Sequence, residues 1–314
     1  MRKLILITAM IFLTPATAAA DVDVGIIINP YAGDRAGPAR DDDAQAMTQG
    51  MSAVIEAAGG RIRREDIIAL RAEDEKQYGR WNRFGLASGH LADQVSENYR
   101  NGIMNVGLYN NCSSLMGMLG GLRHGTDTPQ RVGLVWIDAH GDYNTPETTL
   151  SGMLGGMPVA IATGDALRRM REQAKLDEPL DKSRLVMVSV RDLDKLERAR
   201  VERDQIPQIS TQDVRDLSAN LRDQMQRLTE VSDVVYVHVD LDVLDPAEVS
   251  GHPLTVPDGP TGAELGEAIR VMFQYPKTQA LGLASYPHTS DPGLLTLNAI
   301  HLMVAGALQG IQER

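Results

Sequence analysis

Two apolar runs that each lead into a cluster of acidic residues constrain this chain more than any other feature. Residues 132–137 read VGLVWI and continue into DAHGDYN at 138–144. Residues 234–239 read VVYVHV and continue into DLDVLDP at 240–246. A short apolar run bounded by polar residues is typical of a buried β-strand. The sequence therefore predicts two buried strands with carboxylates at their carboxyl ends.

The acidic residues after these strands are candidate metal ligands. Side chains alternate between the faces of an extended chain, so Asp138, His140 and Asp142 are expected on one side, and Asp240 and Asp242 share a side in the same way. Ligands of α/β sheets bind at the carboxyl ends of the strands. Carboxylates crowded there repel one another unless cations lie between them. A single pair could simply cap a strand end, but the two segments together favour a two-metal site.

Strand-like and helix-like segments alternate along the rest of the chain. Further strands are expected at 22–29, 66–70, 103–108, 185–190 and 280–284. Helical spacing of apolar residues is found at 44–58, 85–99, 153–163, 211–228, 263–273 and 294–309. Such alternation predicts βαβ units, and hence an α/β fold of three α/β/α layers around a mostly parallel sheet. Nothing in the sequence marks an internal linker, so residues 21–314 are predicted to form one domain.

Charge limits the partners that the chain can bind. The sequence has 314 residues, of which 43% are hydrophobic, and a net charge of −11. An acidic chain is a poor candidate for binding phosphate backbones, so nucleic acid is not expected as a partner. A small-molecule substrate suits the acidic site better.

The first twenty residues have the features of a secretory signal peptide. Arg2 and Lys3 form a basic start, residues 4–13 an almost wholly apolar core, and small residues continue to Ala20. We expect cleavage after Ala20 and a periplasmic or secreted bacterial protein. The apolar core is too short to span a membrane as a helix, so no stable membrane insertion is expected.

The two acidic segments resemble the ureohydrolase family, which includes arginases and agmatinases. That family binds two manganese ions through D-A-H-x-D-x-N and D-x-D-x-x-D-P, and both patterns are present at 138–144 and 240–246. Residues 151–158, SGMLGGMP, and 191–194, RDLD, resemble two further motifs of the family. The resemblance implies an arginase-like fold, a hydrolase acting on a C–N bond of a linear amidine or guanidine, two Mn²⁺ ions, and a homo-oligomer, either trimer or hexamer.

The single cysteine of the chain falls in the family's first ligand motif. Where the family has G-G-D-H-S, residues 109–113 read YNNCS, with Cys112 at the histidine position. Hydroxyarginine amidinohydrolases carry a cysteine there, and 144–149 and 255–259 also resemble that branch. An ordinary buried cysteine is the alternative. A thiolate is softer than an imidazole, so this site is expected to bind manganese more weakly or to prefer another divalent metal.

The resemblance assigns two overlapping ligand sets. The first cation would be held by Cys112, Asp138, Asp142 and Asp240. The second would be held by His140, Asp138, Asp240 and Asp242, so that Asp138 and Asp240 bridge the pair.

The resemblance also implies a mechanism. Two metals lower the pKa of a water between them, and the resulting bridging hydroxide attacks the trigonal carbon of the substrate. Asp142 would hold the proton of this nucleophile. Asn144, Ser151 and Asp194 match positions that bind the amino and carboxylate end of the substrate, and Glu197 would assist them.

Three positions depart from the family pattern. Met153 replaces an asparagine that binds the substrate carboxylate, and Gly155 replaces a histidine that carries protons to the leaving amine. His252, on a loop expected near the site, is our candidate for that missing proton carrier. The third departure is the last strand, where 281–287 reads LGLASYP and lacks the glutamate that pairs with a guanidinium.

The missing glutamate leaves the substrate open. Burying a guanidinium without an opposing anion is costly. Either Glu147, Glu248 or Asp291 fills its place, or the substrate is not a guanidinium cation. An arginase-like amide deacetylase and a non-catalytic relative that binds metal or amino acids are therefore the alternative functions.

Overall fold

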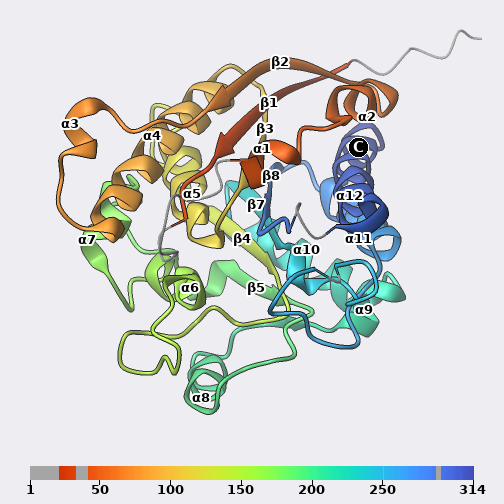
Figure 1. Ribbon diagram of the computed structural model, residues 1–314. Helices are drawn as coiled ribbons and strands as arrows, with labels where there is room; N and C mark the ends of the chain where they lie inside the picture. The colour runs from red at the N-terminus through yellow and green to blue at the C-terminus, as the bar shows by residue number, and fades with distance from the viewer. Residues whose placement is uncertain (1–20, 33–41, 250, 288–290) are drawn as a thin grey trace, which may run out of the picture.

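The computed structural model describes residues 21–32, 42–249, 251–287 and 291–314, and the predicted signal peptide at 1–20 lies outside them. The centre is one eight-stranded sheet in the order β2-β1-β3-β8-β7-β4-β5-β6 (Figure 1). Every pairing in the sheet is parallel. The strands are β1 Val22–Asn29, β2 Gly60–Ile67, β3 Met104–Tyr109, β4 Val132–Ile137, β5 Leu185–Val188, β6 Gln208–Ile209, β7 Val234–Asp240 and β8 Thr278–Ala284.

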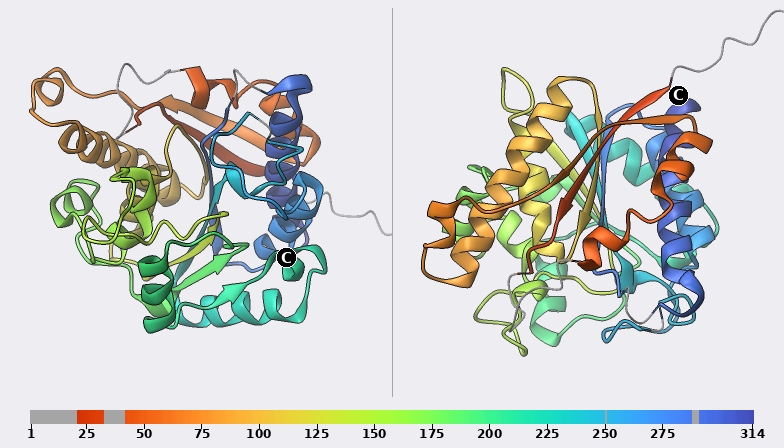
Figure 2. Two further views of the ribbon diagram at one scale, coloured as in Figure 1. Left: turned by 60° about the horizontal axis from the view of Figure 1, so that its bottom comes forward. Right: turned by 45° about the horizontal axis from the view of Figure 1, so that its top comes forward.

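Helices cover both faces of the sheet, as the edge-on view in Figure 2 shows. One hydrophobic core joins the sheet to α1 Asp42–Ala46, α2 Met51–Ala57, α9 Thr211–Arg215, α10 Ala219–Val231, α11 Gly262–Phe273 and α12 Leu295–Gln312. The other joins it to α4 Arg80–Arg100, α5 Leu115–Arg123, α6 Pro158–Ala162, α7 Arg168–Gln173 and α8 Lys195–Arg203. The short α3, Ala72–Glu75, precedes α4. The predicted three-layer α/β/α fold is confirmed, with a sheet that is wholly rather than mostly parallel.

Two long predicted helices are interrupted, the helix expected at 153–163 is shortened to α6, and one strand is displaced. The segment 44–58 breaks at Gly50, which has φ of 74°. The segment 211–228 breaks at Leu217, with φ of 45°, and Ser218 caps the new helix by accepting from the Leu221 amide. Apolar periodicity continues through both breaks, so it does not reveal them. The strand expected at 66–70 is instead β2, whose alternating side chains are largely polar.

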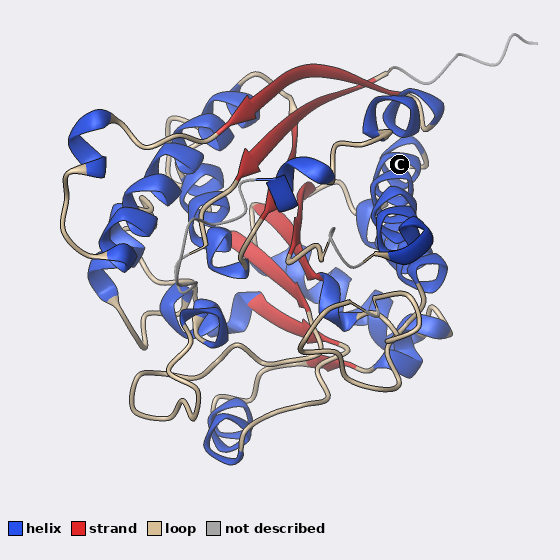
Figure 3. Cartoon of the chain, viewed as in Figure 1, coloured by secondary structure: helices blue, strands red, loops and turns tan. Residues whose placement is uncertain are grey.

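The carboxyl ends of the four central strands meet at one edge of the sheet (Figure 3). In the register of the sheet, Ile137 of β4 pairs with Val239 of β7, and Ala284 of β8 pairs with both Asp240 and Tyr109. Because all the strands are parallel, the residues that follow them converge on the same edge. In the part of the chain that the structure describes, no helix is long and apolar enough to cross a membrane.

Candidate metal centre

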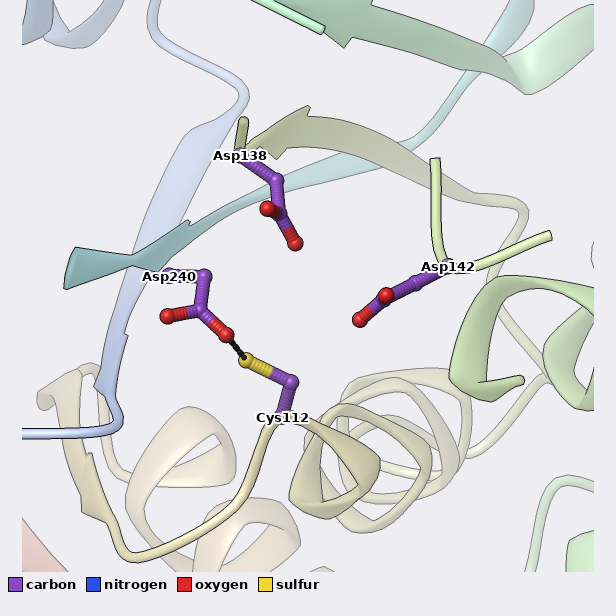
Figure 4. Close-up of side chains that lie close together, drawn as sticks. All are labelled: Cys112, Asp138, Asp142 and Asp240. Carbon is purple, nitrogen blue, oxygen red and sulfur yellow. Dashed lines mark hydrogen bonds between the residues drawn. The ribbon is translucent and has the colours of Figure 1, made fainter. Parts of the chain in front are cut away.

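Four donor side chains from three strand ends converge at this edge (Figure 4). Cys112 begins the 3-10 turn η1, Cys112–Ser114, just after β3, Asp138 and Asp142 follow β4, and Asp240 ends β7. One donor atom from each lies within 4.8 Å of the others. This group is the first ligand set expected from the sequence.

A second group lies beside the first. His140 Nδ1 is 3.4 Å from Asp138 Oδ1 and 3.2 Å from Asp242 Oδ2. Asp240 and Asp242 in turn form a third group with His252, whose Nδ1 is 3.9 Å from Asp242 Oδ2. The structure therefore brings together all six expected ligands, and it adds His252 next to them.

Local hydrogen bonds fix the directions of the carboxylates. Asp138 Oδ1 accepts from the His140 amide at 2.7 Å, and Asp240 Oδ1 accepts from the Asp242 amide at 3.2 Å. Asp240 Oδ2 also accepts from Cys112 Sγ at 2.5 Å and from Ser285 Oγ at 3.1 Å. Each D-x-H or D-x-D segment thus closes its own turn at the strand end, which holds the carboxylates side by side.

Burial and mutual repulsion shift the pKa values of this cluster. Burial first, and then neighbouring carboxylates, raise the pKa values of Asp138 and Asp142 well above 3.8 and that of Asp240 to about 7. Burial and the same carboxylates raise the pKa of the Cys112 thiol. Burial disfavours a charged ring at His140, but Asp138 and Asp242 outweigh it and raise its pKa to about 12. The cluster therefore creates a strongly negative field that favours a positive charge.

The donor atoms fit a pair of divalent cations. Asp138 Oδ2 and Asp242 Oδ1 are buried and have no hydrogen-bond partner, although buried carboxylate oxygens normally have one. The first group offers one sulfur and three oxygen donors, and the second offers a nitrogen and two oxygen donors. Imidazole and carboxylate ligands suit first-row divalent metals, and a thiolate favours the softer ones.

A cavity of about 540 Å³ opens over these ligands. The expected substrate-binding residues Asn144, Ser151, Asp194 and Glu197 all line it. Asn144 Nδ2 donates to Asp194 Oδ2 at 3.2 Å. The cavity thus connects the metal ligands to the polar side chains expected at the other end of the substrate.

The structure does not bring the three suggested replacements for the missing glutamate to the cavity. Glu248 accepts from the Gly262 amide at the start of α11, and Asp291 accepts from the amides of Thr296 and Leu297 in α12. Glu147 is exposed. Two of these acids cap helices, so their carboxylates have structural partners.

Ser285 is a cavity residue that the sequence analysis missed. Its Oγ lies 3.8 Å from Cys112 Sγ, and its backbone has φ of 69° just after β8. It lies within the segment 281–287, which was considered only for its missing glutamate, and its position at the end of a central strand was the signal for it. Asp192, within the RDLD segment, also lines the cavity and was not singled out.

Fold and site together define an α/β protein with a candidate two-cation centre at the carboxyl edge of a parallel sheet. The sequence matches the Arginase family over residues 93–300, and the chain belongs to that family.

Individual relatives agree with this assignment. The chain is 31% identical over 156 residues to an arginase of Staphylococcus aureus strain MRSA252, an alignment that covers 48% of this chain and 51% of that one. It is 28% identical over 186 residues to an arginase of Brucella melitensis biotype 1, covering 58% and 60%. The matched region thus spans only about half the length of these relatives.

Solved structures show the same fold. An arginase from Bacillus subtilis superposes with a TM-score of 0.80 at 22% identity, covering 92% of this chain and 98% of that one. A formimidoylglutamase from Bacillus subtilis superposes with a TM-score of 0.71 at 15% identity, covering 93% and 88%. At such identities the similarity extends to the fold alone.

Proposed function

We propose that this protein is a dinuclear metal-dependent hydrolase that cleaves a C–N bond in a linear amidine or guanidine, most like the hydroxyarginine amidinohydrolases. The observation that carries the proposal is the pair of adjoining donor groups, one with Cys112 and one with His140, on the floor of a substrate-sized cavity. Membership of the arginase family supports the same reaction class.

Two cations, manganese being the expected metal, would balance the charge of the carboxylates. The first would be held by Cys112, Asp138, Asp142 and Asp240, and a softer divalent metal is possible there. The second would be held by His140 and Asp242 together with the shared Asp138 and Asp240. When bound, such a pair acts as a Lewis acid and lowers the pKa of water at the cavity floor.

Asp142 and His252 are the residues that we propose to move protons. Asp142 lines the cavity, where its carboxylate can accept a proton from the attacking water. His252 lines the same cavity, and its ring would give up a proton as the imidazolium, having first taken up the proton that Asp142 accepts from the water. Since Gly155 stands where the family has its proton carrier, His252 is our candidate to protonate the leaving amine.

Polar side chains on the other wall are proposed to bind the far end of the substrate. Asn144 and Ser151 offer hydrogen-bonding groups, and Asp194 offers an anion for an amino group. Ala284 ends the last strand, and no replacement carboxylate comes from that side among the described residues. A hydroxylated guanidine, which leaves as a less basic amine, needs less help from an acid than arginine does.

The test is release of urea or hydroxyurea from L-arginine, N-hydroxy-L-arginine and agmatine, with and without added Mn²⁺. We expect metal-dependent turnover that favours N-hydroxy-L-arginine and falls at least about 100-fold in Asp142→Asn. No turnover of any of these amidines would contradict the proposal. Tight metal binding without any product would instead favour the non-catalytic alternative.

An amide substrate is the second candidate. It is favoured by the lack of a carboxylate at the end of β8, because an amide carries no cation that would need one. Hydrolysis of acylated polyamines or acyl-lysines, in place of amidines, would establish this alternative.

We further propose that residues 1–20 are a signal peptide, that the mature protein is periplasmic or secreted, and that it assembles as a trimer or hexamer. The mature N-terminus from cell fractions and the mass in solution test these points.

A further inference from the structure

The segment Asp142–Tyr143–Asn144 has an unusual backbone conformation, and each of its residues forms backbone hydrogen bonds with other parts of the chain. Asp142 has φ of 45°, in the left-handed region that costs a non-glycine residue free energy. Its carbonyl accepts from the Val159 amide at 3.0 Å. The Asn144 amide donates to the Gly156 carbonyl at 3.2 Å. These bonds leave the two polar backbone groups of Tyr143 to be satisfied from elsewhere.

Helix α8 satisfies both of them. Glu197 Oε1 accepts from the Tyr143 amide at 2.7 Å, and Arg200 Nε donates to the Tyr143 carbonyl at 3.1 Å. The other oxygen of Glu197, Oε2, accepts from the Asp194 amide at 3.2 Å. Glu197 is only 3% exposed, so these bonds lie away from bulk water, where an unmade bond is most costly.

The side chain of Tyr143 anchors the same segment to α8. Its ring is fully buried, and the Arg200 guanidinium lies 4.7 Å from the ring centroid. Its hydroxyl donates to Asp204 at 2.6 Å, just beyond the last residue of α8. Arg200 therefore contacts the segment twice, through the carbonyl and through the ring.

The close approach of α8 also accounts for a glycine in the metal-binding motif. A Cβ at Gly141 would lie 2.4 Å from Leu193 Cδ2 and 2.9 Å from Glu197 Oε1. A larger residue there would have to displace the ends of the Leu193 and Glu197 side chains, and with them the bond from the Tyr143 amide to Glu197. The motif and the helix are thus fitted to each other.

We propose that Glu197 and Arg200 form a clamp that holds Asp142 and Asn144 in position, and that Glu197 is a positioning residue rather than a contact of the substrate. Each Glu197 oxygen accepts from a backbone amide of the segment or of the turn before α8, which gives this side chain its positioning role. Asp194, which lines the same cavity, is then the candidate to bind a substrate amine. The consequence for metal and substrate rests on the proposed function, but the clamp itself rests only on these contacts.

The test is amide hydrogen exchange of Glu197→Gln, with Glu202→Gln as the matched control, since Glu202 is exposed on the same helix. The glutamine side chain has one oxygen and one NH₂ group, so it can accept from only one of the two backbone amides, those of Tyr143 and Asp194. We expect exchange at Tyr143 to rise at least about tenfold in Glu197→Gln only, while amides of β4 stay protected. Unchanged exchange at Tyr143 would overturn the proposal.

Metal binding and kinetics provide a second readout. In Glu197→Gln we expect Mn²⁺ affinity to fall by about 10- to 100-fold, the range for residues that orient ligands. Arg200→Met should lower the Mn²⁺ affinity in the same way, and Arg200→Lys, which keeps the positive charge, should lower it less. A higher KM with unchanged metal affinity and exchange would make Glu197 a substrate contact instead. Because exchange needs neither metal nor turnover, an inactive wild type would sink the proposed function and leave the clamp testable.

Discussion

The Cys112 thiol lies against Asp240 with its sulfur 2.5 Å from a carboxylate oxygen, where the family motif has a histidine. Cys112→Ser keeps the size of the side chain and removes the soft donor. We expect bound metal to fall from two ions to one per chain, because the loss of a ligand should weaken binding by more than the 10- to 100-fold typical of residues that only orient ligands. Metal analysis after gel filtration measures this number. Cys112→His, which restores the family residue, should return it to two, and two ions in Cys112→Ser would rule out sulfur ligation.

Asp233, which directly precedes β7, makes a pH-dependent contribution to the stability of the folded protein. The Arg131 side chain and amide both donate to its carboxylate, and the guanidinium lowers the pKa of Asp233 from 3.8 to about 2. A carboxyl whose pKa is lower in the folded state stabilises the protein above about pH 4 and loses that contribution as the pH falls through 2. Between these pH values, the free energy of unfolding should therefore fall less in Asp233→Asn than in the wild type. Urea midpoints near pH 5 and pH 2.5 test it, and an equal loss in both proteins would contradict it.

At the scale of elements, the sequence predicted the central strands that carry the metal ligands. It did not predict the contacts that fix the backbone after those strands. Strand β4 was predicted at its observed bounds because its side chains are uniformly buried and apolar. The left-handed backbone at Asp142 follows from no local pattern, since contacts with the distant α8 stabilise it. His238 lies two residues before Asp240 in β7, so alternation places both side chains on the same face of the sheet. The His238 ring nevertheless stacks on Trp136, with ring centroids 4.6 Å apart, and burial lowers its pKa to about 3. Alternation identifies a face of the sheet but not what packs on it.

Strand β8 gives a stability test of this packing. A Cβ at Gly282 would lie 2.1 Å from the Tyr236 hydroxyl and 2.9 Å from Tyr109. Gly282→Ala should therefore lower the free energy of unfolding by about 1–3 kcal/mol, the usual cost of overpacking a core. Urea unfolding measures the change. Gly156→Ala, where no atom lies within 4 Å of the added Cβ, is the control and should change stability little.

At the scale of the whole molecule, the carboxylate cluster links metal binding to folding. A ligand that binds only the folded state stabilises it by about 2.7 kcal/mol per site at a concentration 100-fold above Kd. Adding Mn²⁺ to chelator-treated protein should raise Tm by several degrees, and EDTA should reverse the rise. Asp138→Asn, which removes a carboxylate shared by both ligand sets, should abolish most of this shift. A Tm that does not change when divalent cations are added would argue against a metal site at this cluster.

The most direct test of the two-cation centre is a crystal structure of the Mn²⁺-soaked protein with anomalous scattering recorded near the manganese edge. We predict two anomalous peaks at the carboxyl edge of the sheet, both contacting Asp138 and Asp240, with Cys112 Sγ next to one and His140 Nδ1 next to the other. A map without peaks there, with Cys112 turned away from Asp240, would contradict the account.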